Sequence, residues 1–301
     1  MTIDTYSLEE RDWNRLLKRI KAGKCTPFLG AGACYGSLPL GATIAQTWAA
    51  EHDYPFSDTH DLTRVAQYLA LTNDAMFPKD ELLERWFKHA TYPNFAEPDE
   101  PHGVLAQMPL PIYITTNYDD FMTKALQTVG KNPRREICRW NWDVQKKLRD
   151  QPSVFQDRLF TPDEQNPVVF HLHGYNLMPE SIVLTEDDYI DFLISISSDR
   201  TGDLLPLRIQ ESFSDTSLLF IGYSLNDINF RVLFRSIINK VVRTSSYQGF
   251  TVQFPRPDKE SAQRYLEDYF KEWEMKVVWG SAREFMAELS RRWKAFSSGT
   301  T

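Results

Sequence analysis

The 301 residues are enough to bury a large core, and 42% hydrophobic with 25% charged residues is typical of a water-soluble globular protein. The formal net charge is -7, so the chain as a whole repels phosphate backbones and anionic lipid, and direct binding to nucleic acid is not expected. Three cysteines, Cys25, Cys34 and Cys138, are too few and too scattered for a disulfide framework or a four-ligand zinc site. We therefore expect a reducing compartment and no metal.

Residues 1–24 are rich in charge where a signal peptide would be apolar. No run of the sequence approaches the roughly 18 apolar residues of a membrane span. We expect a cytoplasmic protein that does not contact a membrane.

Along the chain, the hydrophobic pattern predicts strands that alternate with helices. The first element is an amphipathic helix, with Ser7 and Glu10 at capping-box spacing and Gly23 as its C-terminal stop. Strands are predicted at 25–29, 111–116, 168–171, 217–221, 250–254 and 276–279. Helices are predicted at 43–52, 61–71, 80–89, 125–129, 226–241, 259–273 and 282–293, with one more capped by Thr185 and Asp188. The charged stretch over 140–166 is predicted to be a long surface connection.

This alternation predicts a single Rossmann-like α/β domain over 1–301, with a mostly parallel sheet and helices on both faces. The helical run at about 43–105 is interpreted as an insertion, and a strand-helix-strand-helix portion follows at about 245–295. Such sheets bind their ligands at the carboxyl ends of the strands. Polar or glycine clusters follow four of the predicted strands, so each cluster is a candidate part of a site.

The first cluster is the glycine turn Gly30-x-Gly32, directly after the first strand. Glycine lets a backbone come close to a pyrophosphate, and a helix N-terminus behind the turn would offer amide donors and a positive dipole. Gly36 falls one place later than the dinucleotide fingerprint requires, and a plain glycine turn explains the pattern about as well.

A second glycine turn, Gly222-Tyr223-Ser224, ends the most apolar strand. A second turn beside the first would suit the ribose and phosphate of a nucleotide. The alternative is that Ser224 or Asn226 simply caps the next helix.

Asn117 and Asp119 follow a strand and would project an amide and a carboxylate into the ligand crevice, with helix capping by Asp119 or Asp120 as the alternative. His171 and His173 follow the next strand. We interpret His173 as a general base and His171 as a hydrogen-bonded structural residue. The pair has no companion ligands for a metal, because the other four histidines lie in unrelated helices or loops. These are His52, His60, His89 and His102.

Taken in order, these segments resemble the sirtuin superfamily, and more closely its prokaryotic sirtuin-like branch of NAD hydrolases found in antiphage defence. The matching segments span most of the chain: FLGAGA at 28–33, TTNYDD at 115–120, HLHG at 171–174, LTEDDY at 184–189 and FIGYSLNDINFR at 220–231.

The resemblance implies that NAD is the substrate and assigns contacts to it. The implied cofactor contacts are Gly30, Ala31 and Gly32 as the phosphate loop, Thr116 beside it, and Gly222 and Ser224 as the turn that holds the adenosine half. Asn117 and Asp119 look like the pair beside the nicotinamide ribose and carboxamide, and His173 matches the catalytic histidine of the family.

We therefore expect hydrolysis of NAD to nicotinamide and ADP-ribose. Asn117 positions the attacking water and the ribose hydroxyls, His173 accepts a proton, and Asp119 orients the carboxamide. Deacylating sirtuins carry a four-cysteine zinc module that this chain cannot supply, which disfavours protein deacylation. A non-catalytic module that senses NAD or an ADP-ribose derivative is the other alternative.

The resemblance to defence proteins also has implications for control, because unrestrained NAD hydrolysis is toxic. We expect a homo-oligomer and a separate regulatory or sensor protein, such as an Argonaute-like or ATPase partner.

Overall fold

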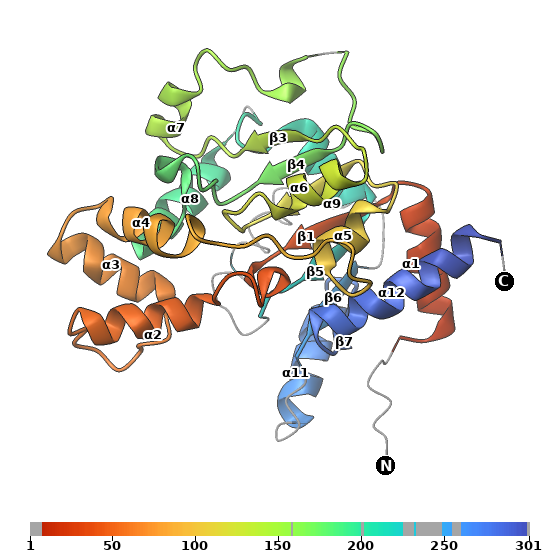
Figure 1. The fold of residues 1–301 in the computed structure, drawn as a ribbon, viewed down its shortest axis with the longest axis horizontal. Coiled ribbons are helices and arrows are strands. Elements are labelled where there is room, and N and C mark those ends of the chain that lie inside the picture. Colours follow the sequence, from red (N-terminus) through yellow and green to blue (C-terminus); the bar gives the residue numbers. More distant parts are fainter. Residues whose placement is uncertain are drawn as a thin grey trace.

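One parallel sheet of seven strands lies at the centre of the structure, a computed structural model that describes residues 8–157, 159–199, 202–224, 232, 249–254 and 260–299 (Figure 1). The strand order is β3-β4-β2-β1-β5-β6-β7, and each neighbouring pair is parallel. The strands are β1 Cys25–Leu29, β2 Ile112–Thr115, β3 Arg134–Ile137, β4 Val168–His171, β5 Ser217–Ile221, β6 Gly249–Gln253 and β7 Met275–Trp279. The predicted Rossmann-like α/β class is confirmed.

Helices connect these strands. Their bounds are α1 Glu10–Lys21, α2 Gly41–Glu51, α3 Leu62–Thr72, α4 Phe77–Leu82, α5 Pro101–Ala106, α6 Phe121–Thr128, α7 Trp142–Lys147, α8 Glu186–Ser198, α9 Leu207–Asp215, α11 Glu260–Lys271 and α12 Ala282–Ser297. Shorter 3₁₀ turns are formed by Ala31–Cys34, Val154–Gln156 and Pro179–Ser181, and Leu83–Phe87 is a π-helical turn. Among the described residues, none of these helices has both the length and the apolar character needed to cross a membrane.

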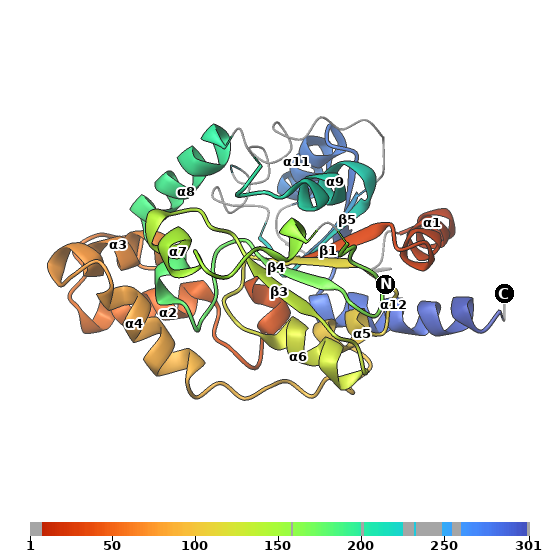
Figure 2. The ribbon, with the colours of Figure 1, turned by 90° about the horizontal axis from the view of Figure 1, so that it is seen from above.

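Both faces of the sheet are covered by helices, as Figure 2 shows. On one face, Phe28, Phe170 and Phe220 pack against α8, α9 and α11. On the other face, Leu29, Tyr113 and other strand residues pack against α1, α5, α6 and α12. Because side chains of a strand alternate between its two faces, the apolar runs of β1 and β5 supply both layers of the core.

Helices α2, α3 and α4 project to one side of the sheet and form a third apolar cluster (Figure 1). This cluster includes Ile182 and Leu184, from the segment that follows β4. A nearly buried ion pair, Lys79 to Asp188 at 2.8 Å, joins α4 to the first turn of α8. The same Asp188 completes a capping box with Thr185, as the sequence predicted. The division of the chain into a domain and an insertion stays a prediction.

The structure differs from the predicted elements where the sequence carries little apolar signal. Edge strand β3 reads RREI and was not predicted, because an edge strand with exposed positions does not need an apolar run. Helix α9 was also missed, and the helix predicted at 80–89 is divided between α4 and the π-helical turn. The connection over 140–166 contains α7 and a 3₁₀ turn. Most of the predicted helix at 226–241, and Ser7 of the predicted capping box, lie outside the described residues.

The turn after β5 gives a test of local packing. Gly222 has φ +81°, and a Cβ there would overlap the backbone nitrogen of Ala33 and lie 2.7 Å from the carbonyl oxygen of Gly30. We expect Gly222→Ala to lower the free energy of unfolding by several kcal/mol, about 3 kcal/mol or more, because backbone strain and overlap add. Denaturant titration measures this loss.

Gly36→Ala is the matched control, because Gly36 has φ +98° but open space where a Cβ would lie. It should lose only the strain of a left-handed conformation, about 1–2 kcal/mol. Equal losses in the two variants would contradict the packing argument.

Candidate functional site

Two glycine turns meet at the carboxyl ends of β1 and β5, the edge at which parallel sheets bind ligands. The N–H of Gly30 donates to the carbonyl of Ile221, and the N–H of Gly32 donates to the carbonyl of Gly222, both at 2.9 Å. A Cβ on Gly32 would lie 2.8 Å from the Cα of Gly222. Contact between the two turns therefore requires these glycines, whatever ligand the turns also bind.

The phosphate loop that the sequence predicted departs from expectation behind the turn. Gly30-x-Gly32 leads into one 3₁₀ turn, Ala31–Cys34, and the following helix α2 begins only at Gly41. The helix N-terminus expected directly behind the glycines is therefore absent from this described segment. Because the N–H groups of Gly30 and Gly32 are engaged, the N–H of Ala31 is the donor that remains in the described turn Gly30-Ala31-Gly32. Ala31 is exposed and Gly32 is half-buried, so the turn is accessible to a ligand.

Asn117 follows β2 and points its side-chain amide at the glycine turn. Its Nδ2 donates to the carbonyl of Gly30 at 3.0 Å and to the sulfur of Cys34 at 3.2 Å. Its own backbone N–H donates to Thr115 at 2.9 Å. Both amide hydrogens are thus engaged, which leaves Oδ1 as the group of Asn117 with which to meet a ligand.

Thr116 joins the two glycine turns from the side. The hydroxyl of Tyr223 donates to the carbonyl of Leu29 at 2.8 Å, so the hydroxyl of Thr116, at 2.7 Å, donates to Tyr223. The predicted cofactor residues Gly30, Thr116 and Gly222 are therefore brought together.

Asp119 is buried, with a relative exposure of 6%. One carboxylate oxygen accepts from the N–H of Phe121 at 2.9 Å, which matches the helix-capping alternative, and the other accepts from the thiol of Cys34 at 3.1 Å. Burial raises the pKa of Asp119, and the nearby His102 opposes this shift. Asp120 occupies the N-cap position of α6 without a side-chain capping bond.

His173 follows β4 and packs its ring edgewise against Tyr189 and Phe192, with centroid distances of 5.2 and 5.0 Å. The ring is 3% exposed, and burial lowers the pKa of His173 to about 3, so the imidazole is neutral at pH 7. Its Nε2 is buried without a hydrogen-bond partner in the described structure. A buried polar atom without a partner is unfavourable unless something else satisfies it.

His171 has the structural position that the sequence predicted. Its Nδ1 lies 3.3 Å from the backbone carbonyl of Asn117, so this nitrogen carries the proton and donates. Residues Thr115 and His171 are paired across β2 and β4, and Asn117 and His173 each lie two residues further on. Among the described residues, no direct hydrogen bond joins Asn117 to His173.

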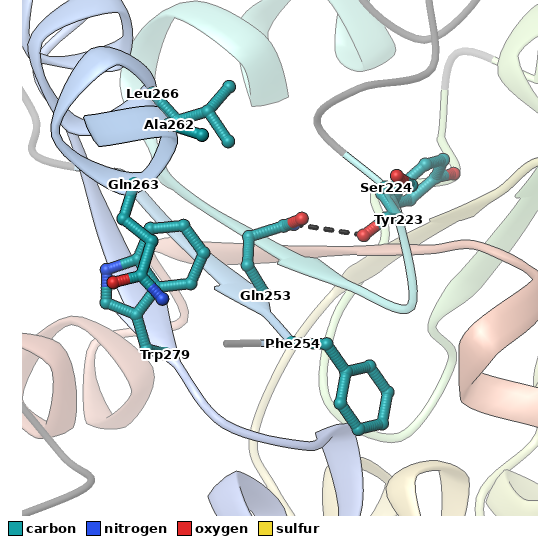
Figure 3. A pocket seen from close by; sticks show the side chains of 8 residues that line it. All are labelled: Tyr223, Ser224, Gln253, Phe254, Ala262, Gln263, Leu266 and Trp279. Carbon is teal, nitrogen blue, oxygen red and sulfur yellow. Dashed lines mark hydrogen bonds between the residues drawn. The ribbon is translucent and has the colours of Figure 1, made fainter. Parts of the chain in front are cut away.

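A pocket opens at the ends of β5, β6 and β7, beside the second glycine turn (Figure 3). It is open to solvent, and its lining includes Ser224, Gln253 and Trp279. Gln253 donates to the backbone carbonyl of Tyr223 at 3.0 Å, which fixes that turn against β6. The predicted residue Ser224 is exposed on this pocket.

Sequence analysis missed one group of side chains beside Asn117. His102, which was assigned to an unrelated context, has its Nε2 3.9 Å from the sulfur of Cys34, and Cys34 in turn contacts Asp119. Glu100 holds the other ring nitrogen of His102 at 2.7 Å. These residues come from segments far apart in the sequence, so no spacing pattern could reveal the group.

The all-parallel sheet with polar groups at its carboxyl edge defines a Rossmann-like α/β protein with a candidate ligand site at that edge. A family profile described as SIR2-like domain matches residues 111–273, which is more than half of the chain, and the chain belongs to this family.

Relatives that are similar over a longer stretch share one name. The NAD(+) hydrolase ThsA of Acinetobacter baumannii is 26% identical over 223 residues, which are 72% of this chain and 39% of the relative. The NAD(+) hydrolase ThsA of Cytobacillus dafuensis is 26% identical over 213 residues, which are 70% of this chain and 37% of the relative. The chain thus spans about two fifths of the length of the curated relatives it matches.

The two buried histidines predict how stability depends on pH. Burial lowers the pKa of His171 and of His173 to about 3, whereas a histidine in an unfolded chain has a pKa of about 6.5. Below about pH 6.5 the unfolded chain therefore binds protons that the folded chain does not, and stability falls as the pH falls. Each histidine contributes a slope of about 1.4 kcal/mol per pH unit.

Replacing His173 by Phe isolates one of these contributions, because phenylalanine has a ring of similar size that does not titrate. Denaturant titrations between pH 7 and pH 4.5 should show a shallower decline in the free energy of unfolding for His173→Phe than for the wild type. Parallel curves would show that His173 is not neutral in the folded protein.

Proposed function

We propose that this chain hydrolyses NAD to nicotinamide and ADP-ribose. The names of its relatives support the reaction, and membership of the SIR2-like family supports a site at this edge of the sheet. The observation that carries the proposal is the placement of Asn117 and His173, each two residues beyond a paired position on adjacent strands. A bound ribose or water would supply the hydrogen-bond partner that Nε2 of His173 lacks in the described structure.

The bond to be broken already has a good leaving group, because nicotinamide departs from NAD as a neutral molecule. The protein then has to hold NAD, exclude competing solvent and stabilise an oxocarbenium-like ribose. Asn117 is suited to position the attacking water and the ribose hydroxyls. Its amide hydrogens are fixed on Gly30 and Cys34, and its Oδ1 can accept from a water or a ribose hydroxyl.

His173 serves as the proton acceptor. Its pKa of about 3 makes it a weak base, but a neutral one that can accept at any pH near 7. A weak base is sufficient because a water molecule that has bonded to an oxocarbenium carbon is strongly acidic and gives up its proton readily.

Asp119 completes the nicotinamide half of the site. Each of its oxygens accepts one hydrogen bond, from Phe121 or from Cys34, and a carboxylate oxygen can accept a second. Asp119 can therefore orient the carboxamide while it holds the start of α6.

The rest of NAD extends across the carboxyl edge of the sheet. The turn Gly30-Ala31-Gly32 lies against the phosphates, and the N–H of the exposed Ala31 donates to them, because the N–H groups of Gly30 and Gly32 are engaged by β5 and its turn. Thr116 is a further contact. The pocket beside Gly222 and Ser224 takes the adenosine half, since it lies beside the second glycine turn and includes the aromatic side chain of Trp279.

We further propose that the reaction serves prokaryotic antiviral defence as a regulated depletion of NAD in the cytoplasm. Because free hydrolysis of NAD is toxic, the resting chain is restrained by its assembly into a homo-oligomer and by a separate sensor protein, Argonaute-like or an ATPase. The acidic net charge of -7 supports a sensor on another chain, because this one is unsuited to bind nucleic acid itself.

Asn117→Ala and His173→Ala test the assigned roles. Nicotinamide release from NAD should fall about 10²- to 10⁴-fold in each variant, because each removes a group that acts in the transition state. His89→Ala is the control, because His89 is exposed and should leave the rate unchanged.

Circular dichroism shows whether the variants fold. Folded variants with full activity would refute the assignment. A wild-type chain that binds NAD without releasing nicotinamide, alone or with its partner, would support the sensing module instead.

If assembly restrains the enzyme, the rate of nicotinamide release depends on the oligomeric state and on the partner. Size-exclusion fractions of the purified chain, with and without the protein encoded beside it in the genome, should differ in nicotinamide release. We expect little release from the isolated monomer and an increase when the oligomer or the partner complex forms. A monomer with the full activity of every other fraction would contradict the proposed restraint.

A further inference from the structure

Cys34, His102 and Asp119 converge beside the glycine turn although they come from three separate segments. Cys34 ends the 3₁₀ turn after β1, His102 lies in α5, and Asp119 precedes α6. All three are buried, and in the part of the chain that the structure describes, their ligand atoms lie within 4.8 Å of one another. We propose that these three side chains bind a divalent cation of the zinc class.

The distances suit a zinc ion with small adjustments. The sulfur of Cys34 lies 3.1 Å from Oδ2 of Asp119 and 3.9 Å from Nε2 of His102. Ligand atoms around a tetrahedral zinc are about 3.3–3.6 Å apart, as follows from bonds of about 2.3 Å to sulfur and about 2.0–2.1 Å to nitrogen or oxygen. The sulfur–oxygen distance is thus slightly shorter than these values and the sulfur–nitrogen distance slightly longer.

Glu100 provides the second observation that indicates a metal site. Its carboxylate lies 2.7 Å from Nδ1 of His102 and also accepts from the backbone N–H of Gly103. With the imidazole proton on Nδ1, the lone pair of Nε2 is directed to Cys34 and Asp119. Metal-binding histidines almost always have such a carboxylate or carbonyl on their other nitrogen, because it fixes the ring and increases its basicity.

A nucleophilic role for Cys34 fits the structure less well. Its thiol donates to Asp119 and not to His102, and burial and the two nearby carboxylates raise the pKa of Cys34 well above its usual value. A bound cation has the opposite effect on Cys34, because its positive charge stabilises the thiolate. When it binds, the S–H bond breaks, a sulfur–metal bond forms, and the proton leaves to solvent.

The cation would be held by two anionic ligands and one neutral one, with Glu100 behind His102. Three protein ligands leave one position of a tetrahedral ion for water. The site differs from a four-cysteine zinc module in composition, position and number of protein ligands. Because Asn117 donates to the sulfur of Cys34, an occupied site would also fix the amide that we assign to NAD hydrolysis.

The test is direct metal binding by the purified full chain after removal of metal. Titration with Zn²⁺ against a chromophoric chelator should show about one equivalent bound, and Co²⁺ should produce a thiolate-to-cobalt charge-transfer band. Affinity should fall about tenfold for each pH unit lost, because one thiol proton is released on binding. A wild-type chain with neither zinc binding nor a thiolate–cobalt band would overturn the proposal.

Variants assign the ligands. Cys34→Ser should abolish the cobalt band, and Glu100→Gln should weaken zinc binding by about 10- to 100-fold. Cys138→Ser is the matched control, because Cys138 is also buried but bonds to the carbonyl of Leu204, and it should bind zinc like the wild type.

A cobalt band that survives in Cys34→Ser, or that disappears in Cys138→Ser, would reject the assigned site. If Cys34→Ser does not fold, the wild-type and Cys138→Ser spectra still identify the cysteine that binds cobalt. A thiolate band that is the same in both comes from Cys34 or Cys25. Cys25→Ser then separates these two, because Cys25 lies in β1 at the opposite end of the strand from the glycine turn.

Discussion

The contact between the two glycine turns is the constraint on which the arrangement of the site depends. Gly30 and Gly32 touch Gly222 backbone to backbone, so the turns after β1 and β5 lie at a separation that no larger residue would permit at these positions. The carbonyl of Gly30, which also accepts from the N–H of Ala33, accepts from the amide of Asn117, and the hydroxyl of Tyr223 donates to the carbonyl of Leu29. The polar edge is thus held by backbone packing, and its side chains are oriented before any ligand arrives.

Burial has opposite effects on the titratable groups at this edge. It keeps His173 neutral and thereby preserves a lone pair, while it disfavours the charges of Asp119 and of Cys34. For Asp119 the structure opposes this effect with nearby His102 and with hydrogen bonds from Phe121 and Cys34. The neutral imidazole of His173 lies after β4, whereas Cys34 and Asp119 follow β1 and β2.

The sequence was sufficient for features that local patterns encode. Strands β1, β4 and β5 have the predicted bounds because each is a short apolar run that ends in a polar or glycine turn. Strand β3 was missed because its three consecutive charged residues form no such run. The group around His102 was missed because tertiary structure alone brings residues 34, 102 and 119 together. The phosphate-loop interpretation of the glycines stays a prediction, and their packing against each other could not be predicted because it depends on the tertiary fold.

The ion pair between Lys79 and Asp188 couples the projecting helices α2, α3 and α4 to helix α8, which packs against His173. Asp188 also caps α8, whose residues Tyr189 and Phe192 form the walls around the His173 ring. Separating a nearly buried ion pair is expensive, so α4 cannot swing away from the sheet without drawing the start of α8 with it. A displacement of the outer helices would therefore change the aromatic packing around the His173 ring.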